Sequence, residues 1–429
     1  MAFYNTPKYR RSRRAYVAQC TFEYFITLLV SDAFLAKLLS SIGISDSLIG
    51  IISSFLSLAF IFQLLSLFVT TFSVNKKKTV IAFNIVSQIM FCMLYLIPFL
   101  PLNKRGKTVL IMLGVLFAYV AQYIAAPILF QWANSYVDPF RRARYSAIKE
   151  IVSLFSGMVF SSVLGYVIDR YERLGNINGA FLFISSVMLV TALFNLASLL
   201  LIKGDSKKQE KAISGRMIKE TLGNKKYRKL VVMAVLWNCA LYFSVGFWGV
   251  FKTKDLLLSV FAVQLINIAG QLARLLLSVP FGRYSDKNGF AKGFELAAWI
   301  AAAGFLVNIF ITRRLWPLII LQTMCYHISM AGTNQNSFNI VYSYVNAECI
   351  SQAMAIKNSV GGICGFIAAL IAGKIVSGIR DSGNMLFGIP VLPQQVLSAI
   401  SLVFTVATII YMKRFFTGRR ADSGVFHEK

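Results

Sequence analysis

The sequence predicts an all-α membrane protein of twelve transmembrane helices, arranged as two pseudo-symmetric bundles of six. The first observation behind this is composition. Hydrophobic residues make up 57% of the 429 and charged residues 14%, whereas an ordinary globular domain is about 25% charged. The apolar residues come in blocks of roughly 20–28, the helix length that crosses a hydrocarbon core about 30 Å thick. Such blocks predict membrane-spanning helices along the whole chain.

The second observation is a stretch that occurs twice. SYVDPFRRARYSAIKEIVSLFSGMVFSSVLG, at 135–165, returns at 343–373 as SYVNAECISQAMAIKNSVGGICGFIAALIAG, a gapless offset of 343 − 135 = 208 residues. Small residues recur at every fourth position, as Ser153, Gly157, Ser161 and Gly165 in the first copy and Gly361, Gly365, Ala369 and Gly373 in the second. Such a stripe lines one helical face and lets another helix approach closely. We therefore interpret the chain as one half repeated.

The elements follow in order. Gly43 ends the first span and Ser45-Asp46 can cap the second. The predicted spans are 15–42, 46–72, 79–102, 108–137, a fifth between the polar segments 138–144 and 169–179, 179–202, 229–251, 255–281, 290–312, 315–345, 351–379 and 391–415. This makes 1–202 the first half, 203–228 a basic linker, 229–415 the second half and 416–429 a tail. In the linker, Ile213, Met217, Ile218 and Leu222 share one helical side, which favours a surface-lying helix or a plain solvated linker.

The distribution of basic residues predicts the orientation. About 30 of the 44 Lys and Arg residues lie in the two tails and the even-numbered connections. Because cytoplasmic loops are rich in Lys and Arg, both termini are expected in the cytoplasm. The net charge of +27 is therefore assigned to the cytoplasmic face of a cell membrane and not to a nucleic-acid partner. The six cysteines form no CxxC, so neither a metal site nor a cofactor is expected.

The segment after the eighth span reads GRYSDKNGFAK, from Gly282 to Lys292. It resembles the signature loop of the major facilitator superfamily, in which a glycine, three residues, Asp-Arg/Lys, a glycine and basic residues follow one another. The matching positions are Gly282, Asp286, Lys287, Gly289 and Lys292. The resemblance implies that family's fold, function as a monomer, and a loop that locks one conformation through pairs with helix ends. The first-half counterpart, TTFSVNKKKT, lacks the glycines and the aspartate, and exporter motifs are absent, so no subfamily is assigned.

The resemblance implies a substrate site between the halves, near the bilayer midplane. Pro127 in the fourth span and its counterpart in the tenth, 127 + 208 = 335, predict two interrupted helices that expose backbone groups to a wet cavity. The polar residues close to these positions are Gln122, Gln131, His327, Asn334 and Gln335. The alternative interpretation is that these amides only bond helices to one another.

Two polar stripes point to a coupling site. The first span carries Glu23 and Thr27, and the eighth carries Gln271 and Arg274. At 1.5 Å per residue, Glu23 and Arg274 lie roughly 10–12 Å from the same side of the membrane. A carboxylate at such depth is costly and needs a cavity or a partner. We predict that Glu23 carries a proton and that Arg274 pairs with it or binds an anionic substrate, the alternative being a fixed structural ion pair.

Three further residues complete the expected set. Asn238 and nearby aromatic residues share the seventh span, where stacking of a ring-bearing substrate and plain packing are both open. Lys149 and Lys357, the lysines of the repeated Ala-Ile-Lys, lie just inside the cytoplasmic ends of the fifth and eleventh spans. We expect these two to be anchors or gate contacts and not substrate ligands.

These patterns predict a secondary active transporter that moves a small organic solute by alternating access, coupled to a proton or another ion. An enzyme is not expected, because the chain has two histidines, no HExxH and no phosphate-binding loop. One alternative is a multidrug efflux antiporter, which the absent exporter motifs disfavour. An alternative of another class is a transporter-like sensor or lipid scramblase, which the degraded first-half loop favours.

Overall fold

The computed structural model describes residues 7–72, 75–134, 136–137, 142–203, 223–345 and 349–417. The elements in this part of the chain are α1 (Pro7–Leu29), α2 (Asp32–Ser41), α3 (Asp46–Ser53), α4 (Phe55–Ala59), η2 (Phe60–Phe62), α5 (Gln63–Phe72), α6 (Lys76–Leu94), η3 (Ile97–Phe99), α7 (Lys104–Asn134), α8 (Arg142–Arg173), α9 (Ile177–Leu201), α11 (Lys225–Tyr242), η5 (Val245–Phe247), α12 (Trp248–Val250), η6 (Phe251–Asp255), α13 (Val260–Asn288), α14 (Phe290–Ile309), α15 (Leu318–Tyr344), α16 (Ile350–Asp381), β1 (Met385–Leu386), β2 (Ile389–Pro390), α17 (Pro393–Met412) and η8 (Lys413–Thr417). The two strands pair as a short antiparallel hairpin, which the sequence analysis did not predict. The predicted linker helix and residues 135 and 138–141 of the first repeat copy lie outside the described residues.

The predicted all-α membrane fold is confirmed. Ten helical segments of the described chain are long and apolar enough to cross a membrane. Helices α1 and α15, of 23 and 27 residues, are also long enough to cross a membrane but are more polar, and with them the described chain has the twelve helices of the predicted fold. These two are the polar spans: α1 carries the arginines and Glu23, and α15 carries His327 and the amides near Asn334.

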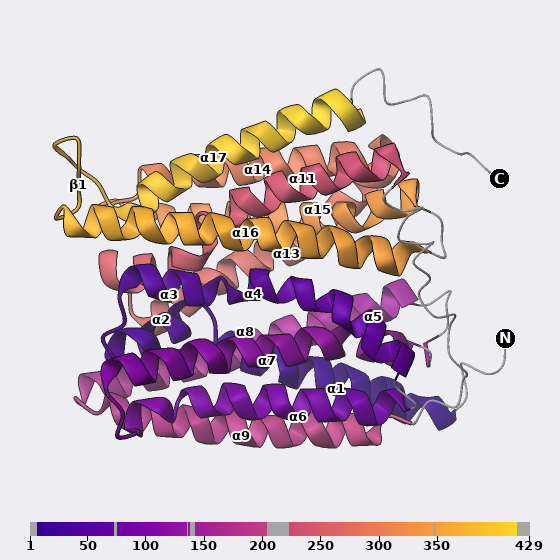
Figure 1. The fold of residues 1–429 in the computed structure, drawn as a ribbon, viewed down its shortest axis with the longest axis horizontal. Helices are drawn as coiled ribbons and strands as arrows, with labels where there is room; N and C mark the ends of the chain where they lie inside the picture. Colours follow the sequence, from indigo (N-terminus) through magenta and orange to yellow (C-terminus); the bar gives the residue numbers. More distant parts are fainter. Residues whose placement is uncertain are drawn as a thin grey trace. The chain divides into compact units, whose positions relative to one another are not determined.

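Contacts divide the chain into two compact units. The first contains Met1–Ser45, Phe62–Ile213 and Leu258–Gln264, and the second contains Asp46–Ile61, Ser214–Leu257 and Leu265–Lys429. Figure 1 shows α1, α6, α7, α8 and α9 of the first unit running alongside one another, and α11, α14, α15, α16 and α17 doing so in the second. Each unit therefore takes one short segment from the other half of the sequence: α3 and α4 join the second unit, and the first turns of α13 join the first.

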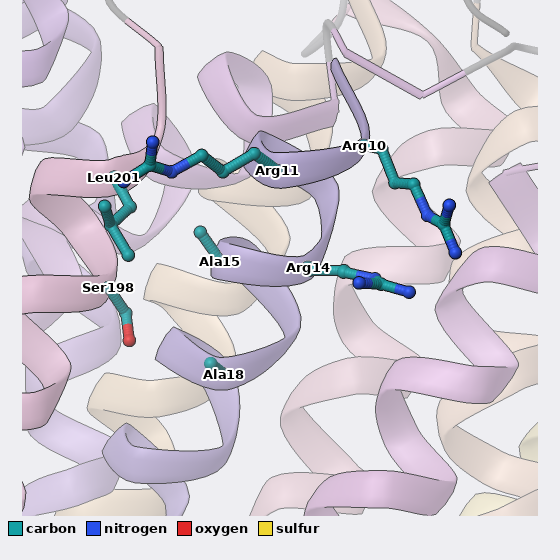
Figure 2. Close-up of a pocket in the computed structure, with 7 residues that line it drawn as sticks. All are labelled: Arg10, Arg11, Arg14, Ala15, Ala18, Ser198 and Leu201. Atoms are coloured by element: carbon teal, nitrogen blue, oxygen red, sulfur yellow. The ribbon is translucent and has the colours of Figure 1, made fainter. Parts of the chain in front are cut away.

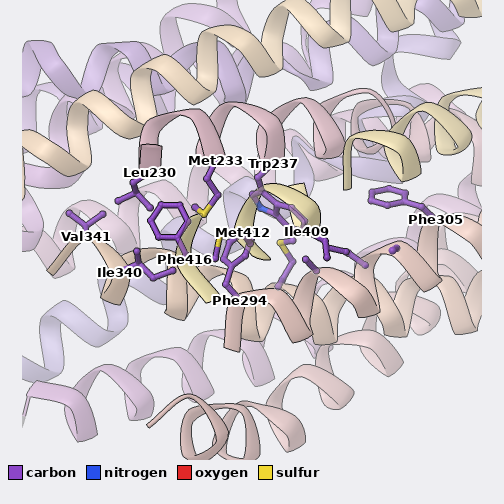
Figure 3. Close-up of a cluster of buried hydrophobic side chains, with 14 of the residues drawn as sticks. Leu230, Met233, Trp237, Phe294, Phe305, Ile340, Val341, Ile409, Met412 and Phe416 are labelled. Atoms are coloured by element: carbon purple, nitrogen blue, oxygen red, sulfur yellow. The ribbon is translucent and has the colours of Figure 1, made fainter. Parts of the chain in front are cut away.

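Each unit has its own apolar core. In the second unit, Trp237, Phe294 and Met412 lie among the side chains of α11, α14 and α17 (Figure 3). In the first unit, Trp132 of α7 is fully buried, and its indole nitrogen donates to the carbonyl of Lys203, 3.0 Å away. Tryptophan is buried at little cost where its N–H finds an acceptor. These cores hold the helices that carry the polar side chains described below.

The prediction of one unbroken first span was wrong, because α1 ends at Leu29 and α2 begins at Asp32. Asp32 has φ of 45°, a conformation that Asp tolerates better than most residues. Carbonyl groups at the end of α1 find new donors: the Tyr95 hydroxyl donates to Leu29 at 2.6 Å and the Ser31 hydroxyl to Leu28 at 3.0 Å. Because these groups are satisfied, the helix can break inside an apolar bundle.

The predicted interruptions at Pro127 and near Gln335 were also wrong. Helix α7 continues through Pro127, whose missing N–H removes a single bond of the ladder. Helix α15 is continuous, and two of its side chains bond its own backbone: Thr333 Oγ1 donates to the Ser329 carbonyl and Asn336 Nδ2 to that of Gly332. The seventh span is broken instead, since α11 ends at Tyr242 and is followed by short 3₁₀, α and π segments.

Candidate functional site

Glu23 lies at the centre of a polar cluster in the first unit. Its carboxylate accepts hydrogen bonds from Gln19 Nε2, one turn earlier in α1, at 2.6 Å and from Gln122 Nε2 of α7 at 2.9 Å. Asn195 of α9 donates to the backbone carbonyl of Gln19 at 3.4 Å, and the Gln19 side chain is fully buried. Both of these carboxylate partners are neutral amides, so they donate hydrogen bonds to the carboxylate without forming an ion pair with it.

Two neighbours proposed for this cluster have other roles or cannot be placed. The Thr27 hydroxyl donates to the backbone carbonyl of Tyr24 at 2.8 Å, so it bonds its own helix. The side chain of Gln131 lies outside the described residues. Arg274 belongs to the second unit and Glu23 to the first, so their pairing stays a prediction.

The second unit brings its own polar residues close together. Gln271 and Arg274 lie on α13, and Gln271 is buried. A side chain at Gly270 would overlap the ring of His327, so this glycine is what allows α15 to bring the imidazole against α13. Asn238, by contrast, donates to the carbonyl of Ala234 within α11, at 2.8 Å.

A buried lysine, which the sequence analysis missed, extends the same group. Lys252 follows α12 and is 2% exposed. Its Nζ lies 3.3 Å from Oδ1 of Asn267 on α13 and 5.7 Å from the ring centre of Trp248. A buried ammonium needs such partners because leaving water is costly. The π-helical turn at Phe251–Asp255 turns this lysine inward, and no periodic pattern in the sequence indicates such a turn.

The segment predicted as a signature loop is mostly helix, which corrects that expectation. Helix α13 runs to Asn288, so Gly282, Asp286 and Lys287 lie on its last turns. Only Gly289 leaves helical geometry, with φ of 94°, and its N–H bonds the carbonyl of Ser285 at 2.8 Å. Lys292 follows on the first turn of α14. Asp286, Lys287 and Lys292 are exposed, and their gating role stays a prediction.

Gln335 and Asn334, both on α15, are exposed. The amide nitrogen of Gln335 lies 3.5 Å from where a Cβ of Gly282 would be, so these two positions are neighbours in the second unit. Asn334 and Gln335 lie about two turns from His327 along the same helix.

The two repeated lysines contact different helices of their units. Lys149 of α8 places its Nζ 5.0 Å from the ring centre of Tyr16 on α1. Lys357 of α16 is buried and donates to the hydroxyl of Ser337 on α15 at 2.8 Å. Each therefore reaches a span that carries candidate site residues, and the role of both lysines as anchors or gate contacts stays a prediction.

An ionic cluster in the second unit was not recognised from the sequence. Arg380, at the end of α16, lies 3.1 Å from Asp46 and 2.6 Å from Asp255, and it also donates to Asn384. Lys254 lies 2.5 Å from the other oxygen of Asp46. The cluster ties the start of α3 to the ends of the seventh and eleventh spans. Separations of more than 120 residues hide it from local pattern reasoning.

Asp169 forms a comparable link in the first unit. Its two carboxylate oxygens accept from the backbone N–H groups of Val260 and Phe261, each at 2.9 Å. The Ser259 hydroxyl accepts from Ala262 at 3.2 Å. The first amides of a helix lack partners within it, and a carboxylate there also interacts well with the helix dipole. Asp169 of α8 thereby holds the start of α13.

The small-residue stripes of the repeat are close-packing surfaces for segments from the other half of the sequence. A Cβ on Gly165 of α8 would lie 3.1 Å from the backbone of Phe261. The equivalent Gly373 of α16 accepts a hydrogen bond from Ser47 of α3 at 2.7 Å. About three turns earlier in α16, next to the stripe position Gly361, Gly362 accepts from the Ser57 hydroxyl at 2.9 Å. In each unit, the stripe receives a short helical segment from the other half of the sequence.

Replacing Gly362 with alanine is expected to destabilise the protein. Its methyl group would overlap the carbonyl oxygen of Ser57, and backbone atoms cannot move aside easily. Overpacking of this kind costs about 1–3 kcal/mol. Thermal unfolding of the purified protein should show a lower Tm. Gly378→Ala, on the same helix with open space around it, is the matched control and should leave the Tm unchanged or higher; equal Tm losses in both variants would contradict the assignment.

Comparison with known proteins places this geometry in a family. The family model described as Major Facilitator Superfamily matches residues 17–369. A search of the curated proteins finds no matching sequence. The structure is similar to that of the nucleoside transporter NupG (TM-score 0.66, 13% identity, 95% of this chain and 100% of that one). It is also similar to a D-xylose-proton symporter (0.68, 14%, 93% and 96%) and to a bacterial homologue of the human lysosomal transporter Spinster (0.69, 13%, 95% and 97%).

These similarities show the fold, and the family match extends over more than half of the chain. Together with the twelve helices, the match confirms the resemblance that the segment from Gly282 to Lys292 indicated. The family is one of transporters and not of enzymes. The chain belongs to the Major Facilitator Superfamily.

Proposed function

We propose that this protein is a secondary active transporter that carries a small organic solute across the cell membrane by alternating access, driven by protons. The observation that carries the proposal is the Glu23 carboxylate, held inside a membrane-spanning bundle by the amides of Gln19 and Gln122. Placing a carboxyl group at this depth in a membrane costs free energy, and carboxyl groups found there usually have a functional role. Protonation would neutralise it and turn one of its two acceptor oxygens into a donor, so one of the two amides would have to reorient, which couples proton binding to a change in helix contacts.

Polar side chains of the second unit supply the other part of the mechanism. Gln271, Arg274 and His327 offer donors, acceptors and a fixed positive charge suited to a polar or anionic solute. Two of the similar structures, a nucleoside transporter and a proton-coupled xylose transporter, handle hydrophilic solutes by their descriptions. Both support a hydrophilic solute, and the symporter supports proton coupling.

The outer ionic cluster and the Asp169 contact support alternating access. With both termini in the cytoplasm, Asp46, Asp169, Asp255 and Arg380 all lie at the extracellular ends of their spans. We assign these contacts to an outer gate that forms when the extracellular side is closed. Opening this gate would separate α3 from α16 and the start of α13 from α8.

Reconstitution of the purified protein into vesicles tests the function. An inward proton gradient should drive saturable uptake of a solute from a panel of radiolabelled nucleosides, sugars and small organic acids, and a protonophore should abolish it. The same vesicles, carrying fluorescent lipid, report lipid movement between leaflets through quenching of outer-leaflet dye. Lipid movement without solute uptake would identify a scramblase, and neither activity would point to a sensor, so both results would overturn the proposal.

A further inference from the structure

A shallow groove of about 470 Å³ lies on the first unit, at the N-terminal end of α1. Its lining residues are Arg10, Arg11, Arg14, Ala15, Ala18, Ser198 and Leu201. Figure 2 shows Arg11 extending towards Leu201 of α9, while Arg10 and Arg14 extend from the other flank of α1, with Ala15 and Ala18 between them. The floor is thus small and apolar, and the rim carries three guanidinium groups.

The groove is held in place by contacts on the opposite face of α1. The Ser12 hydroxyl accepts from the backbone N–H of Lys203 at 3.1 Å. Arg13 donates to the carbonyl of Tyr136 at 3.4 Å, and its own carbonyl accepts from the Tyr145 hydroxyl at 2.6 Å. These bonds fix the rotation of α1, so the other arginines face outward.

The three outward arginines have no hydrogen bond or ion pair with the residues that the structure describes, and all three are exposed. Four arginines within five positions repel one another, which is unfavourable unless an anion is close. Arg13 donates to the backbone carbonyl of Tyr136, so Arg10, Arg11 and Arg14 are the arginines of this cluster that face an anion at the surface.

At the C-terminal end of α9, the repulsion that an anion would meet is reduced by a lysine. Helix C-termini carry partial negative charge and repel anions. Here the ammonium of Lys77 donates to the carbonyls of Leu200 and Ile202, at 2.7 and 2.6 Å, and offsets that charge. Along its length, α9 also carries large exposed apolar residues. They are Leu189, Val190, Leu193, Phe194 and Leu200, each more than half exposed.

We propose that this groove binds an anionic phospholipid, with the phosphate held by Arg11 beside Leu201, the positive charges of Arg10 and Arg14 attracting it from the other flank, and the acyl chains along α9. Guanidinium groups match the oxygens of a phosphate in paired hydrogen bonds. Clusters of basic residues next to a membrane-spanning helix attract anionic lipids. Free phosphate has the same chemistry as the headgroup, but it makes no apolar contacts with Ala15, Ala18 and α9. Because the acyl chains of a lipid do make these contacts, the groove favours the lipid.

Native mass spectrometry of the full-length protein in neutral detergent tests the proposal. Phosphatidylglycerol and phosphatidylcholine with identical acyl chains are added at equal concentration, and the lipid-bound fractions are compared. The wild type should retain phosphatidylglycerol about tenfold better. The variant Arg10→Gln/Arg11→Gln/Arg14→Gln should lose this preference, whereas Lys225→Gln/Lys226→Gln/Arg228→Gln, with equal charge loss at the start of α11, should keep it.

A second variant and a competitor complete the test. Ala18→Trp keeps every arginine but fills the floor, and it should lower retention of phosphatidylglycerol in the same way. Inorganic phosphate at millimolar concentration should not displace the lipid. If the triple arginine variant still prefers phosphatidylglycerol, or if inorganic phosphate displaces the lipid completely, the groove is not a phospholipid site.

Discussion

Replacing Glu23 with glutamine is expected to abolish proton-driven uptake and to leave the protein folded. Glutamine has nearly the same size and can still bond Gln19 and Gln122, but it cannot gain or lose a proton. If Glu23 carries the coupled proton, uptake driven by an inward proton gradient should fall to the level of protein-free vesicles. The measurement is the initial rate of uptake at several external pH values.

Two further measurements separate coupling from folding. Exchange of labelled for unlabelled solute at equal pH needs binding and alternating access but no net proton movement, so Glu23→Gln should retain it. Glu172→Gln is the matched control, because Glu172 is half exposed and pairs with Lys37 at the end of α8. This control should transport at the wild-type rate. An unchanged pH dependence in Glu23→Gln would remove Glu23 from the coupling role.

Replacing Arg380 with glutamine is expected to lower the stability of the second unit. Asp255 is only 8% exposed and Asp46 is 16% exposed in their side chains, so removing the guanidinium leaves two largely buried carboxylates with less compensation. Breaking one member of such a cluster costs about 3 kcal/mol when it is fully buried, and less at the partly exposed end of a helix. The apparent Tm in detergent should fall.

A second substitution tests whether charge imbalance is the cause. Adding Asp255→Asn to Arg380→Gln removes the uncompensated carboxylate and should recover part of the lost Tm. Lys254→Gln removes a side chain that is 37% exposed, and a surface ion pair contributes about 1 kcal/mol or less. A loss in Lys254→Gln as large as that in Arg380→Gln would show that burial does not control the energy of this cluster.

The ionic cluster around Arg380 is also expected to affect the transport rate, which should fall in Arg380→Gln. If these ion pairs close the outer gate, Arg380→Gln favours the open arrangement, and the gate returns to the closed one less readily. The Asp169 contact is the equivalent link in the first unit. Its two hydrogen bonds join α8 to the start of α13, and under the proposed alternating access both links break and re-form in each transport cycle.

Much of the fold follows from the sequence. Apolar blocks of membrane-crossing length predict the helices, because backbone groups in lipid must bond internally. The 208-residue repeat predicts two related halves and identifies Gly165 and Gly373 as close-packing positions, which the structure shows receiving Phe261 and Ser47. The carboxylate of Glu23 stands out because an acidic residue inside an apolar block is costly.

Only the tertiary structure decided which residues meet. Periodicity tells which side chains share a face of one helix, but it does not tell which helix will pack there. The amide of Gln122 that holds Glu23 lies 99 residues away, and the aspartate that caps α13 lies 91 residues before it. At the breaks after Leu29 and Tyr242, side chains of distant helices bond backbone carbonyls: Tyr95 donates to Leu29 at 2.6 Å, and Gln394 of α17 donates to Ser244 at 3.5 Å. Composition and repetition therefore determined the helices and their packing faces, and the polar contacts that carry the proposed function came from the fold.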